Sequence, residues 1–242
     1  MKRLSIFIPA FNEEASIRTT IDALNDLYSN SKLEMECIVI DDGSTDRTAE
    51  IVENAITEYP FLRLVQNETN KGYSDVIKTG FKESVTEFIV WIDADLQNDP
   101  SDIPVLLDYL QRDNVGLVIG WRKNRKDSLF RKIVSMVYNR VLMRLFFGLN
   151  YNDINGKPKA LRREFVSKIK ISSKGWLIDA ELVKKAEDLG FKVIEIPVRH
   201  QLRKLGESKL SIKSIFRTQK YILEYFLNQR KQKPENLLKK KA

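Results

Sequence analysis

Cysteine and histidine are almost absent from this chain of 242 residues, which contains one of each. A single cysteine, Cys37, excludes an internal disulfide bond. Because Cys37 lies in the apolar run CIVI, we expect a small buried thiol and a reducing, cytoplasmic setting. The single histidine, His200, is interpreted either as a hydrogen-bonded loop residue or as a group that reaches a metal or a diphosphate.

Long hydrophobic runs are also missing. No segment reaches the roughly 18 uninterrupted apolar residues that are typical of a membrane-spanning helix. The first apolar run ends after about six positions, which is fewer than the core of a signal peptide contains. Because 43% of the residues are hydrophobic, the chain can still bury a sizeable core, as one large domain or two small ones. We therefore expect a folded protein without a transmembrane helix or internal repeats.

The two halves of the chain differ in charge. The formal net charge is +8, but residues 1–110 contain 9 Lys and Arg against 21 Asp and Glu, whereas residues 111–242 contain 32 against 12. A basic half indicates a polyanionic partner, such as an anionic membrane surface, a phosphorylated substrate or nucleic acid. Nucleic acid is disfavoured, because the acidic half would repel its phosphates.

Short apolar runs alternate with amphipathic patterns, which predicts an α/β fold with a mostly parallel central sheet flanked by helices. Strands are expected at residues 4–10, 36–42, 62–66, 87–93, 115–120 and 191–198. Helices are expected at residues 14–28, 45–58, 74–81, 102–111 and 179–189, the last ended by Gly190. Runs such as CIVI and FIVWI are apolar throughout, as strands that are buried on both faces are.

Polar clusters follow four of these strands, at the edge of the sheet where α/β proteins bind ligands. They are PAFNEE (9–14), DDGSTD (41–46), DADLQNDP (93–100) and GWRKNRK (120–126). Asp93, Asp95 and Gln97 provide oxygen ligands of the kind that Mg²⁺ or Mn²⁺ prefers, and a cation would relieve the repulsion between the carboxylates. The alternative is that the acids cap loops, and Asp99 before Pro100 is expected to cap a helix.

The adjacent acids Asp41 and Asp42 end the run CIVI, a position where an acidic side chain can bind a base or a ribose. The same stretch also contains turn-forming residues, and Thr45 or Asp46 could cap the following helix. The pair is therefore predicted to bind a nucleotide, with turn formation as the alternative.

Four ordered motifs, IPAFNEE, VIDDGSTDRT, NKGYSDVIKTGF and DADLQNDP, resemble those of the inverting glycosyltransferases of family 2, which have the GT-A nucleotide-sugar-binding fold. The similarity covers roughly residues 4–210. DADLQNDP, IGWR and the late RKLGESK are most similar to polyprenyl-phosphate sugar synthases of the dolichyl-phosphate mannosyltransferase type. The resemblance implies a metal-dependent transfer of one sugar, mannose or glucose, from a GDP- or UDP-linked donor to a polyprenyl (dolichyl) phosphate, with Mg²⁺ or Mn²⁺ as the cofactor.

The resemblance also implies roles for particular residues. The nucleotide sugar would be bound by Pro9, Ala10, Asn12, Glu13, Asp41, Asp42, Lys71 and Asp93. The metal would be bound by Asp95 as the principal ligand, with Asp93 and Gln97 assisting. The catalytic residues would be Asp95, then Arg122 and Arg131 on the acceptor phosphate, and Arg203 and Lys209 over the diphosphate.

Two departures from the family pattern concern the acceptor and the donor. The QxxRW signature of processive polysaccharide synthases is absent, which argues against a chain-elongating enzyme. The stretch DINGKPKALRR stands where the mannosyl synthases usually carry an SGFR-like sequence, which leaves the donor sugar open. A lipid monophosphate acceptor would be largely deprotonated at neutral pH, whereas a sugar hydroxyl would need a general base, with Asp179 or Glu181 as candidates.

Residues 128–147, with thirteen apolar and four basic side chains, and residues 210–229 combine apolar bulk with cations. This composition is typical of helices that lie on an anionic membrane, although either segment could instead pack on the sheet. We expect a catalytic domain over residues 1–210 and a basic amphipathic helix and tail over 211–242. The protein would be peripheral on the cytoplasmic face of a membrane, alone or through a membrane-protein partner. The open alternatives are a glycan or glycolipid acceptor and a non-catalytic polyanion-binding protein.

Overall fold

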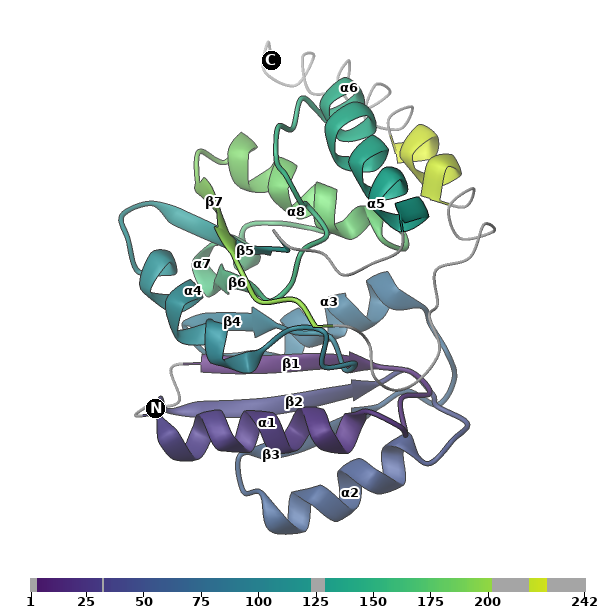
Figure 1. Ribbon diagram of the computed structural model, residues 1–242, viewed down its shortest axis with the longest axis vertical. Helices are drawn as coiled ribbons and strands as arrows, with labels where there is room; N and C mark the ends of the chain where they lie inside the picture. Colours follow the sequence, from purple (N-terminus) through teal and green to yellow (C-terminus); the bar gives the residue numbers. More distant parts are fainter. Residues whose placement is uncertain (1–3, 32, 123–128, 202–217, 226–242) are drawn as a thin grey trace, which may run out of the picture.

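In the computed structural model, the chain is described over residues 4–31, 33–122, 129–201 and 218–225. Within these ranges it forms one seven-stranded sheet with helices on both faces, so the predicted α/β fold is confirmed (Figure 1). The predicted diphosphate ligands Arg203 and Lys209 lie outside the described residues, as does most of the predicted segment 210–229.

The strands follow the order β3-β2-β1-β4-β6-β5-β7 across the sheet. They are β1 (Leu4–Ala10), β2 (Met35–Asp41), β3 (Leu62–Gln66), β4 (Phe88–Trp91), β5 (Val115–Trp121), β6 (Lys159–Arg162) and β7 (Lys192–Pro197). β6 is antiparallel to both of its neighbours, and the other neighbouring strands are parallel. The carboxyl ends of β1, β2, β4 and β5 therefore meet at one edge of the sheet.

The helices cover the two faces of the sheet in separate groups. They are α1 (Ile17–Asn30), α2 (Thr48–Glu58), α3 (Tyr73–Glu83), α4 (Ile103–Leu110), α5 (Leu129–Met136), α6 (Met143–Phe147), α7 (Arg163–Ser167) and α8 (Leu177–Asp188), with a 3-10 turn at Pro100–Asp102 and a π-helical segment at Val137–Leu142. The core on one face contains residues of α1, α2 and α4, and the core on the other face contains residues of α3, α6, α7 and α8.

The first strand shows why both faces need a covering layer. Ile6 and Ile8 of β1 join the core with α1, and Phe7 between them joins the core with α3. Successive side chains of a strand point to opposite faces, so a run that is apolar throughout buries surface on both sides. The Phe7 ring centroid lies 5.4 Å from that of Phe81 on α3 and 5.9 Å from that of Trp91 on β4.

Strand β6 is not predicted by the sequence pattern. Its four residues, KALR, begin with a lysine and are too few to show a period. In the sheet, Lys159 pairs with Trp91 of β4 and with Ile119 of β5. Hydrogen bonding to two apolar strands therefore makes this segment a strand, and it carries the preceding loop to the carboxyl edge of the sheet.

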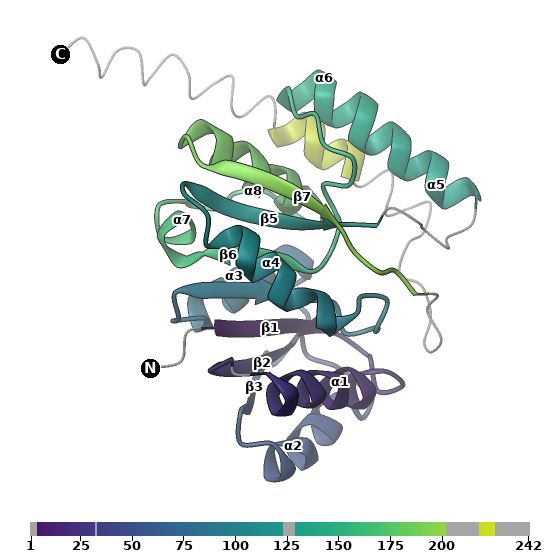
Figure 2. The ribbon, with the colours of Figure 1, turned by 60° about the vertical axis from the view of Figure 1, so that its left-hand side comes forward.

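The predicted helix 128–147 is confirmed over residues 129–147, where α5, the π-helical segment and α6 follow one another directly. Met143 and Phe147 pack into the core shared with α8. The helix lies beside the helical segment 218–225, where the rings of Phe147 and Tyr225 are 5.6 Å apart (Figure 2).

Within the described ranges, no helix has both the length and the apolar character that crossing a bilayer would require.

Candidate active site

A cleft of about 1050 Å³ opens at the carboxyl edge of the sheet. Residues at the ends of four strands reach it, namely Ala10, Asp42, Asp93 and Arg122. Its other walls come from α3, the helix over residues 129–147, the loop before β6, the start of α8 and residues 218–222. Members of the polar clusters that follow β1, β2, β4 and β5 thus line one cavity.

Asp93 and Asp95 both line the cleft and are half-buried, and Gln97 lines it beside them. Asp95 Oδ1 accepts a hydrogen bond from the backbone N–H of Gln97 at 3.1 Å. Leu96 between them has a φ of 54°, in the left-handed region that residues with a β-carbon rarely adopt. Such strain is found at functional sites more often than elsewhere, and here it lies within the predicted metal-binding motif.

The donor set of this motif fits a hard divalent cation. Two carboxylates and an amide provide oxygen ligands, and Mg²⁺ commonly binds through one or two carboxylates while phosphates and water complete its shell. No group of three or more His, Cys, Asp or Glu side chains forms a metal cage in the described part of the chain. The motif therefore suits a cation that arrives with a diphosphate better than one held by protein ligands alone.

The loop after Asp95 is fastened to the segment 199–201. The backbone N–H of Gln201 donates to the carbonyl of Gln97 at 2.9 Å, and Asn98 forms an antiparallel bridge with His200. His200 is buried in this loop and is not among the residues that line the cleft, which favours the loop interpretation of this histidine.

Asp99 caps the start of the 3-10 turn Pro100–Asp102, as predicted, and its Oδ1 accepts a hydrogen bond from the backbone N–H of Ser101 at 3.0 Å. Asp46 lies one residue before Arg47, which occupies the N-cap position of α2, and its Oδ1 accepts a hydrogen bond from the backbone N–H of Thr48 at 2.9 Å. Asp99 also pairs with Arg199 at 3.2 Å. Asp99 therefore belongs to the scaffold of the site, whereas Asp93 and Asp95 face the cleft.

Asp42 orders the loop that leads into α3. Its Oδ1 accepts hydrogen bonds from the side chain of Asn67 and the backbone N–H of Lys71, each at 2.9 Å, and its Oδ2 accepts one from the backbone N–H of Gly72 at 2.9 Å. Gly72 has a φ of 92°, which glycine adopts without cost. Asp42 and Lys71 both line the cleft, so the predicted donor site and this loop are one structure.

The remaining residues of the predicted nucleotide pocket divide into two groups. Pro9, Ala10 and Glu13 line the cleft, whereas Asn12 and Asp41 do not. Asn12 Oδ1 accepts a hydrogen bond from the backbone N–H of Thr45 at 2.8 Å, and Asp41 Oδ2 accepts one from the side chain of Gln66 at 3.0 Å. Asn12 and Asp41 thus shape the loops behind the cleft, and direct contact with a nucleotide stays a prediction for both.

Arg122 and Arg131, the predicted ligands of the acceptor phosphate, both line the cleft. Arg122 donates to Asp153 through two parallel hydrogen bonds, Nε to Oδ2 at 2.7 Å and Nη2 to Oδ1 at 2.8 Å. Asp153 is buried, so this charge-assisted pair fixes the plane of the guanidinium group. A fixed plane is what bidentate binding of a phosphate requires.

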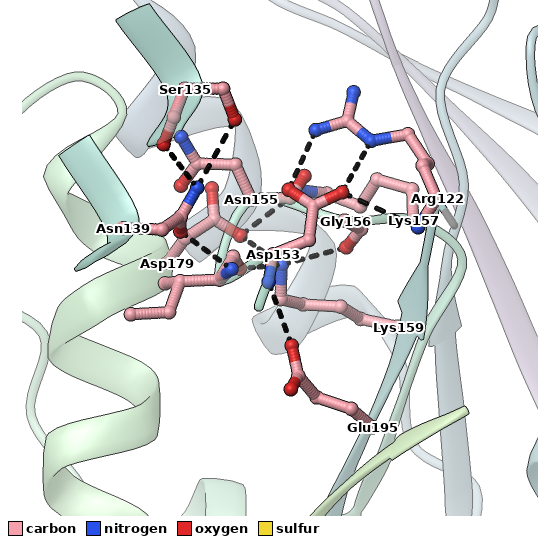
Figure 3. Close-up of polar contacts among 11 residues, drawn as sticks. Arg122, Ser135, Asn139, Asp153, Asn155, Gly156, Lys157, Lys159, Asp179 and Glu195 are labelled. Carbon is pink, nitrogen blue, oxygen red and sulfur yellow. Dashed lines mark hydrogen bonds and ion pairs between the residues drawn. The ribbon is translucent and has the colours of Figure 1, made fainter. Parts of the chain in front are cut away.

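The loop that carries Asp153 is held from two sides (Figure 3). Glu195 of β7 accepts a hydrogen bond from the backbone N–H of Asp153 at 2.8 Å. Asn139, in the π-helical segment, accepts one from the backbone N–H of Ile154 at 2.8 Å and donates to the carbonyl of Ser135 at 2.8 Å. The orientation of Arg122 therefore depends on a strand and a helix that are distant in the sequence.

A buried cluster of Lys157, Lys159 and Asp179 lies beside this loop (Figure 3). Asp179 Oδ1 accepts hydrogen bonds from Lys157 Nζ at 2.9 Å and from Lys159 Nζ. Lys159 Nζ also donates to the carbonyls of Ile154 at 2.7 Å and Gly156 at 2.9 Å. Burial lowers the pKa of Lys159, and the charge of Asp179 opposes this shift.

These contacts bear on the two candidates for a general base. Asp179 lines the cleft, but one of its carboxylate oxygens is already paired with two ammonium groups. Glu181 is fully buried and accepts hydrogen bonds from the backbone N–H groups of Ser172 at 3.0 Å and Ser173 at 2.7 Å. Burial raises the pKa of Glu181, but the hydrogen bonds from Ser173 and Ser172 outweigh it and leave the pKa below its usual range. Neither carboxylate is arranged to take a proton from a hydroxyl group.

Tyr73 and Trp91 are site residues that the sequence pattern does not single out. Their ring centroids are 5.7 Å apart, and Tyr73 lines the cleft. Burial, together with the nearby charges of Asp179 and Asp93, raises the pKa of Tyr73 well above its usual value. Tyr73 therefore lines the same cleft as the predicted metal motif and Asp179. Its position directly after the NKG turn was the available signal.

Similarity to known proteins now identifies the family. Residues 5–170 match glycosyl transferase family 2. The chain belongs to this family. It is 32% identical over 222 residues to the dodecaprenyl-phosphate galacturonate synthase of Rhizobium johnstonii. The aligned region covers 88% of this chain and 63% of that protein. It is 34% identical over 216 residues to the undecaprenyl-phosphate 4-deoxy-4-formamido-L-arabinose transferase of Pectobacterium atrosepticum, with 87% and 63% covered. The chain thus spans less than two thirds of the length of these family 2 relatives.

The fold of this family 2 chain is similar to that of a solved enzyme. The glucosyl-3-phosphoglycerate synthase from Mycobacterium tuberculosis, in complex with Mn²⁺, uridine diphosphate and phosphoglyceric acid, superposes with a TM-score of 0.69. The two chains are 20% identical, and the match covers 85% of this chain and 72% of the other. At this identity the similarity concerns the fold, and it confirms the predicted GT-A architecture.

Proposed function

We propose that this protein is a metal-dependent, inverting glycosyltransferase that transfers one sugar from a nucleotide-diphosphate sugar to a polyprenyl phosphate at a membrane surface. One observation carries the proposal: a single cleft brings the carboxylates of Asp93 and Asp95 together with the guanidinium of Arg122, which Asp153 holds in a fixed plane. The acidic pair suits a donor diphosphate with its cation, and the arginine suits a second phosphate.

The donor would bind on the side of the cleft formed by β1, β2 and β4. The loop that Asp42 organises would hold the nucleoside, and Lys71 lies in the same loop. The diphosphate leaving group accumulates negative charge as the glycosidic bond breaks, so cations near it stabilise the transition state more than the ground state. A divalent ion at Asp93, Asp95 and Gln97 would supply this electrostatic stabilisation.

The acceptor would bind on the side formed by Arg122, Arg131 and the helix over residues 129–147. A lipid monophosphate is largely dianionic at neutral pH, so its oxygen can attack without a general base. The pairing of Asp179 with two lysines and the use of Glu181 to hold a loop agree with an acceptor that needs none. The names of both curated relatives specify a polyprenyl phosphate, which supports the same acceptor class.

The helix over residues 129–147 would place the cleft at the bilayer. It leaves a row of large apolar side chains in water, where the exposed fractions of Leu129 and Leu145 are 73% and 74%. Lys132, Arg140 and Arg144 are exposed on the same helix. Apolar side chains flanked by cations suit a helix that lies in the interface of an anionic membrane. We propose that this helix holds the protein at a membrane surface, on its cytoplasmic face.

The identity of the sugar is a separate part of the proposal. The motifs predict mannose or glucose. The names of the relatives specify galacturonate and 4-deoxy-4-formamido-L-arabinose, which are two further candidates. A glycan or glycolipid acceptor is the second candidate, because the departure at DINGKPKALRR lies beside the cleft in the loop that carries Asp153.

A transfer assay tests the proposal. Purified protein is incubated with undecaprenyl phosphate in anionic vesicles, Mn²⁺ and a panel of labelled GDP- and UDP-sugars, with and without EDTA. We expect label from one donor to pass into the organic phase in a reaction that EDTA stops. Label that appears only in water-soluble products would point to the glycan acceptor. No turnover of any donor would contradict the enzymatic function and leave a polyanion-binding protein.

A further inference from the structure

The cluster of Lys157, Asp179 and Lys159 contains one more cation than anion and is almost completely removed from water. The exposed fractions of the three residues are 3%, 1% and 0%. The Nζ atom of Lys159 is surrounded by three acceptors, on Ile154, Gly156 and Asp179. An ammonium group has three N–H donors and can bond to all three acceptors, whereas a neutral amine has only two. Burial lowers the pKa of Lys159 to about 7. When Lys159 is protonated the cluster carries a buried charge of +1, which is unfavourable unless an anion compensates it.

Lys157 is the lysine of the cluster that reaches the cleft. Its Nζ donates to Asp179 at 2.9 Å and to the carbonyl of Asn155 at 3.2 Å, and it lies 3.9 Å from the centroid of the Trp91 ring. A carbonyl and an aromatic face attract an ammonium group but carry no net charge. Lys157 lines the cleft, and Lys159 is not among the lining residues.

A second group lines the same cleft from the helix over residues 129–147. The hydroxyl of Tyr138 is buried, lines the cleft and has no hydrogen-bond partner among the described residues. Burial and the charge of Asp179 raise the pKa of Tyr138, so its hydroxyl keeps its proton and can donate it in a hydrogen bond. A buried donor without an acceptor costs free energy unless a ligand provides one.

We propose that Lys157 and Tyr138 form a subsite for an anionic oxygen group of the substrates, either a carboxylate on the transferred sugar or the phosphate of the acceptor. The anion would accept hydrogen bonds from the Lys157 ammonium and the Tyr138 hydroxyl and would cancel the residual charge of the cluster. The subsite rests on the proposed function, and Lys157 and Tyr138 line the same cleft as Asp93 and Asp95.

Two donors that differ only in a carboxylate on the sugar show whether the anion comes from the sugar or from the acceptor phosphate. UDP-galacturonate and UDP-galactose are titrated calorimetrically in the presence of Mn²⁺ into wild-type protein, Lys157→Met, Tyr138→Phe and the control Lys192→Met. The control makes the same substitution at an exposed lysine of β7 that does not line the cleft. The KM for undecaprenyl phosphate is measured for all four proteins, and circular dichroism and Tm report their folding.

If the anion is a sugar carboxylate, the wild type binds UDP-galacturonate about tenfold or more tightly than UDP-galactose, and Lys157→Met and Tyr138→Phe lose this preference. If it is the acceptor phosphate, the same two variants raise the KM for undecaprenyl phosphate about tenfold and bind both donors as the wild type does. Lys192→Met leaves the affected quantity within about threefold. Because the Tyr138 hydroxyl has no hydrogen-bond partner among the described residues, Tyr138→Phe tests the subsite even if Lys157→Met does not fold.

The subsite is overturned if neither the preference for UDP-galacturonate nor the KM for undecaprenyl phosphate changes in Lys157→Met and Tyr138→Phe. It is also overturned if Lys192→Met changes the affected quantity as much as Lys157→Met does. Wild-type protein that transfers no sugar to any acceptor would instead contradict the proposed function. The two failures are therefore distinguishable.

Discussion

Asp153 holds Arg122 from a position 31 residues later in the chain, through two hydrogen bonds of 2.7 and 2.8 Å. Asp153→Asn keeps the shape of the side chain but removes its charge and one acceptor. We expect the free energy of unfolding to fall by about 1.5 to 3 kcal/mol, because hydrogen bonds to charged groups contribute this much. We also expect kcat/KM for the acceptor to fall while the donor Kd is unchanged. The exposed Asp188→Asn is the control, and an unchanged kcat/KM in Asp153→Asn would show that Arg122 does not need this partner.

Asp95 and Asp99 stand four residues apart in one motif but have different surroundings, which makes them a matched pair. Asp95→Asn removes a carboxylate from the cleft, and we expect a loss of transfer rate of roughly 10²- to 10³-fold, the effect of deleting one transition-state contact. Asp99→Asn changes a helix cap and should retain activity within about threefold, because losing part of a cap costs only about 1 kcal/mol of stability. Calorimetric titration of Mn²⁺ with UDP present checks the cause. Equal loss of metal affinity in both variants would contradict the assignment of Asp95.

Asn139 joins the helix over residues 129–147 to the loop that carries Asp153. Asn139→Ala leaves the buried backbone N–H of Ile154 without its acceptor, so we expect destabilisation by about 1 to 3 kcal/mol in urea denaturation. The acceptor KM should rise as well, because the loop also orients Arg122. Asn30→Ala, which removes an exposed amide at the end of α1, is the control and should change neither quantity. A loss of stability without any change in KM would make Asn139 a structural residue only.

The exposed apolar side chains and cations of the helix over residues 129–147 predict that the protein binds to anionic vesicles. Each cation near an anionic leaflet contributes on the order of 1 kcal/mol, so the double substitution Arg140→Glu and Arg144→Glu should weaken binding at least about tenfold in a flotation assay. The same charge change at Lys168 and Lys192, exposed cations outside this helix, is the control. Equal flotation of both double variants would remove this helix from the membrane-binding surface.

The lowered pKa of Glu181 predicts that the stability of the protein depends on pH. Its pKa in the folded protein lies below 4.5, the ordinary value of a glutamate, so its contribution to stability is present above pH 4.5 and is lost as the pH falls through the folded-state pKa. We expect wild-type protein to lose stability below about pH 4.5 more steeply than Glu181→Gln, as measured by urea denaturation at each pH. Parallel curves for the two proteins would show that the hydrogen bonds from Ser172 and Ser173 do not depend on the charge of Glu181.

Much of the site could be predicted because its motifs follow strands. Asp93, Asp95, Gln97, Asp42, Lys71 and Arg122 were expected at one edge of the sheet, and all of them line the cleft. Asp41 and Asn12 could not be told apart from their neighbours in this way, because adjacent residues of a turn point in different directions. Whether such a side chain faces the cleft or a backbone N–H depends on the φ and ψ angles of the turn.

The sequence by itself determined the alternation of strands and helices, the burial of both faces of the sheet and the position of the acidic motif, because hydrophobic periodicity and strand ends are local properties. Only the tertiary structure decided that KALR becomes a strand, that Asp153 binds Arg122 and that Lys157 and Lys159 share Asp179. These contacts join residues that are distant in the chain, and each depends on hydrogen-bond distances and directions that no local pattern encodes.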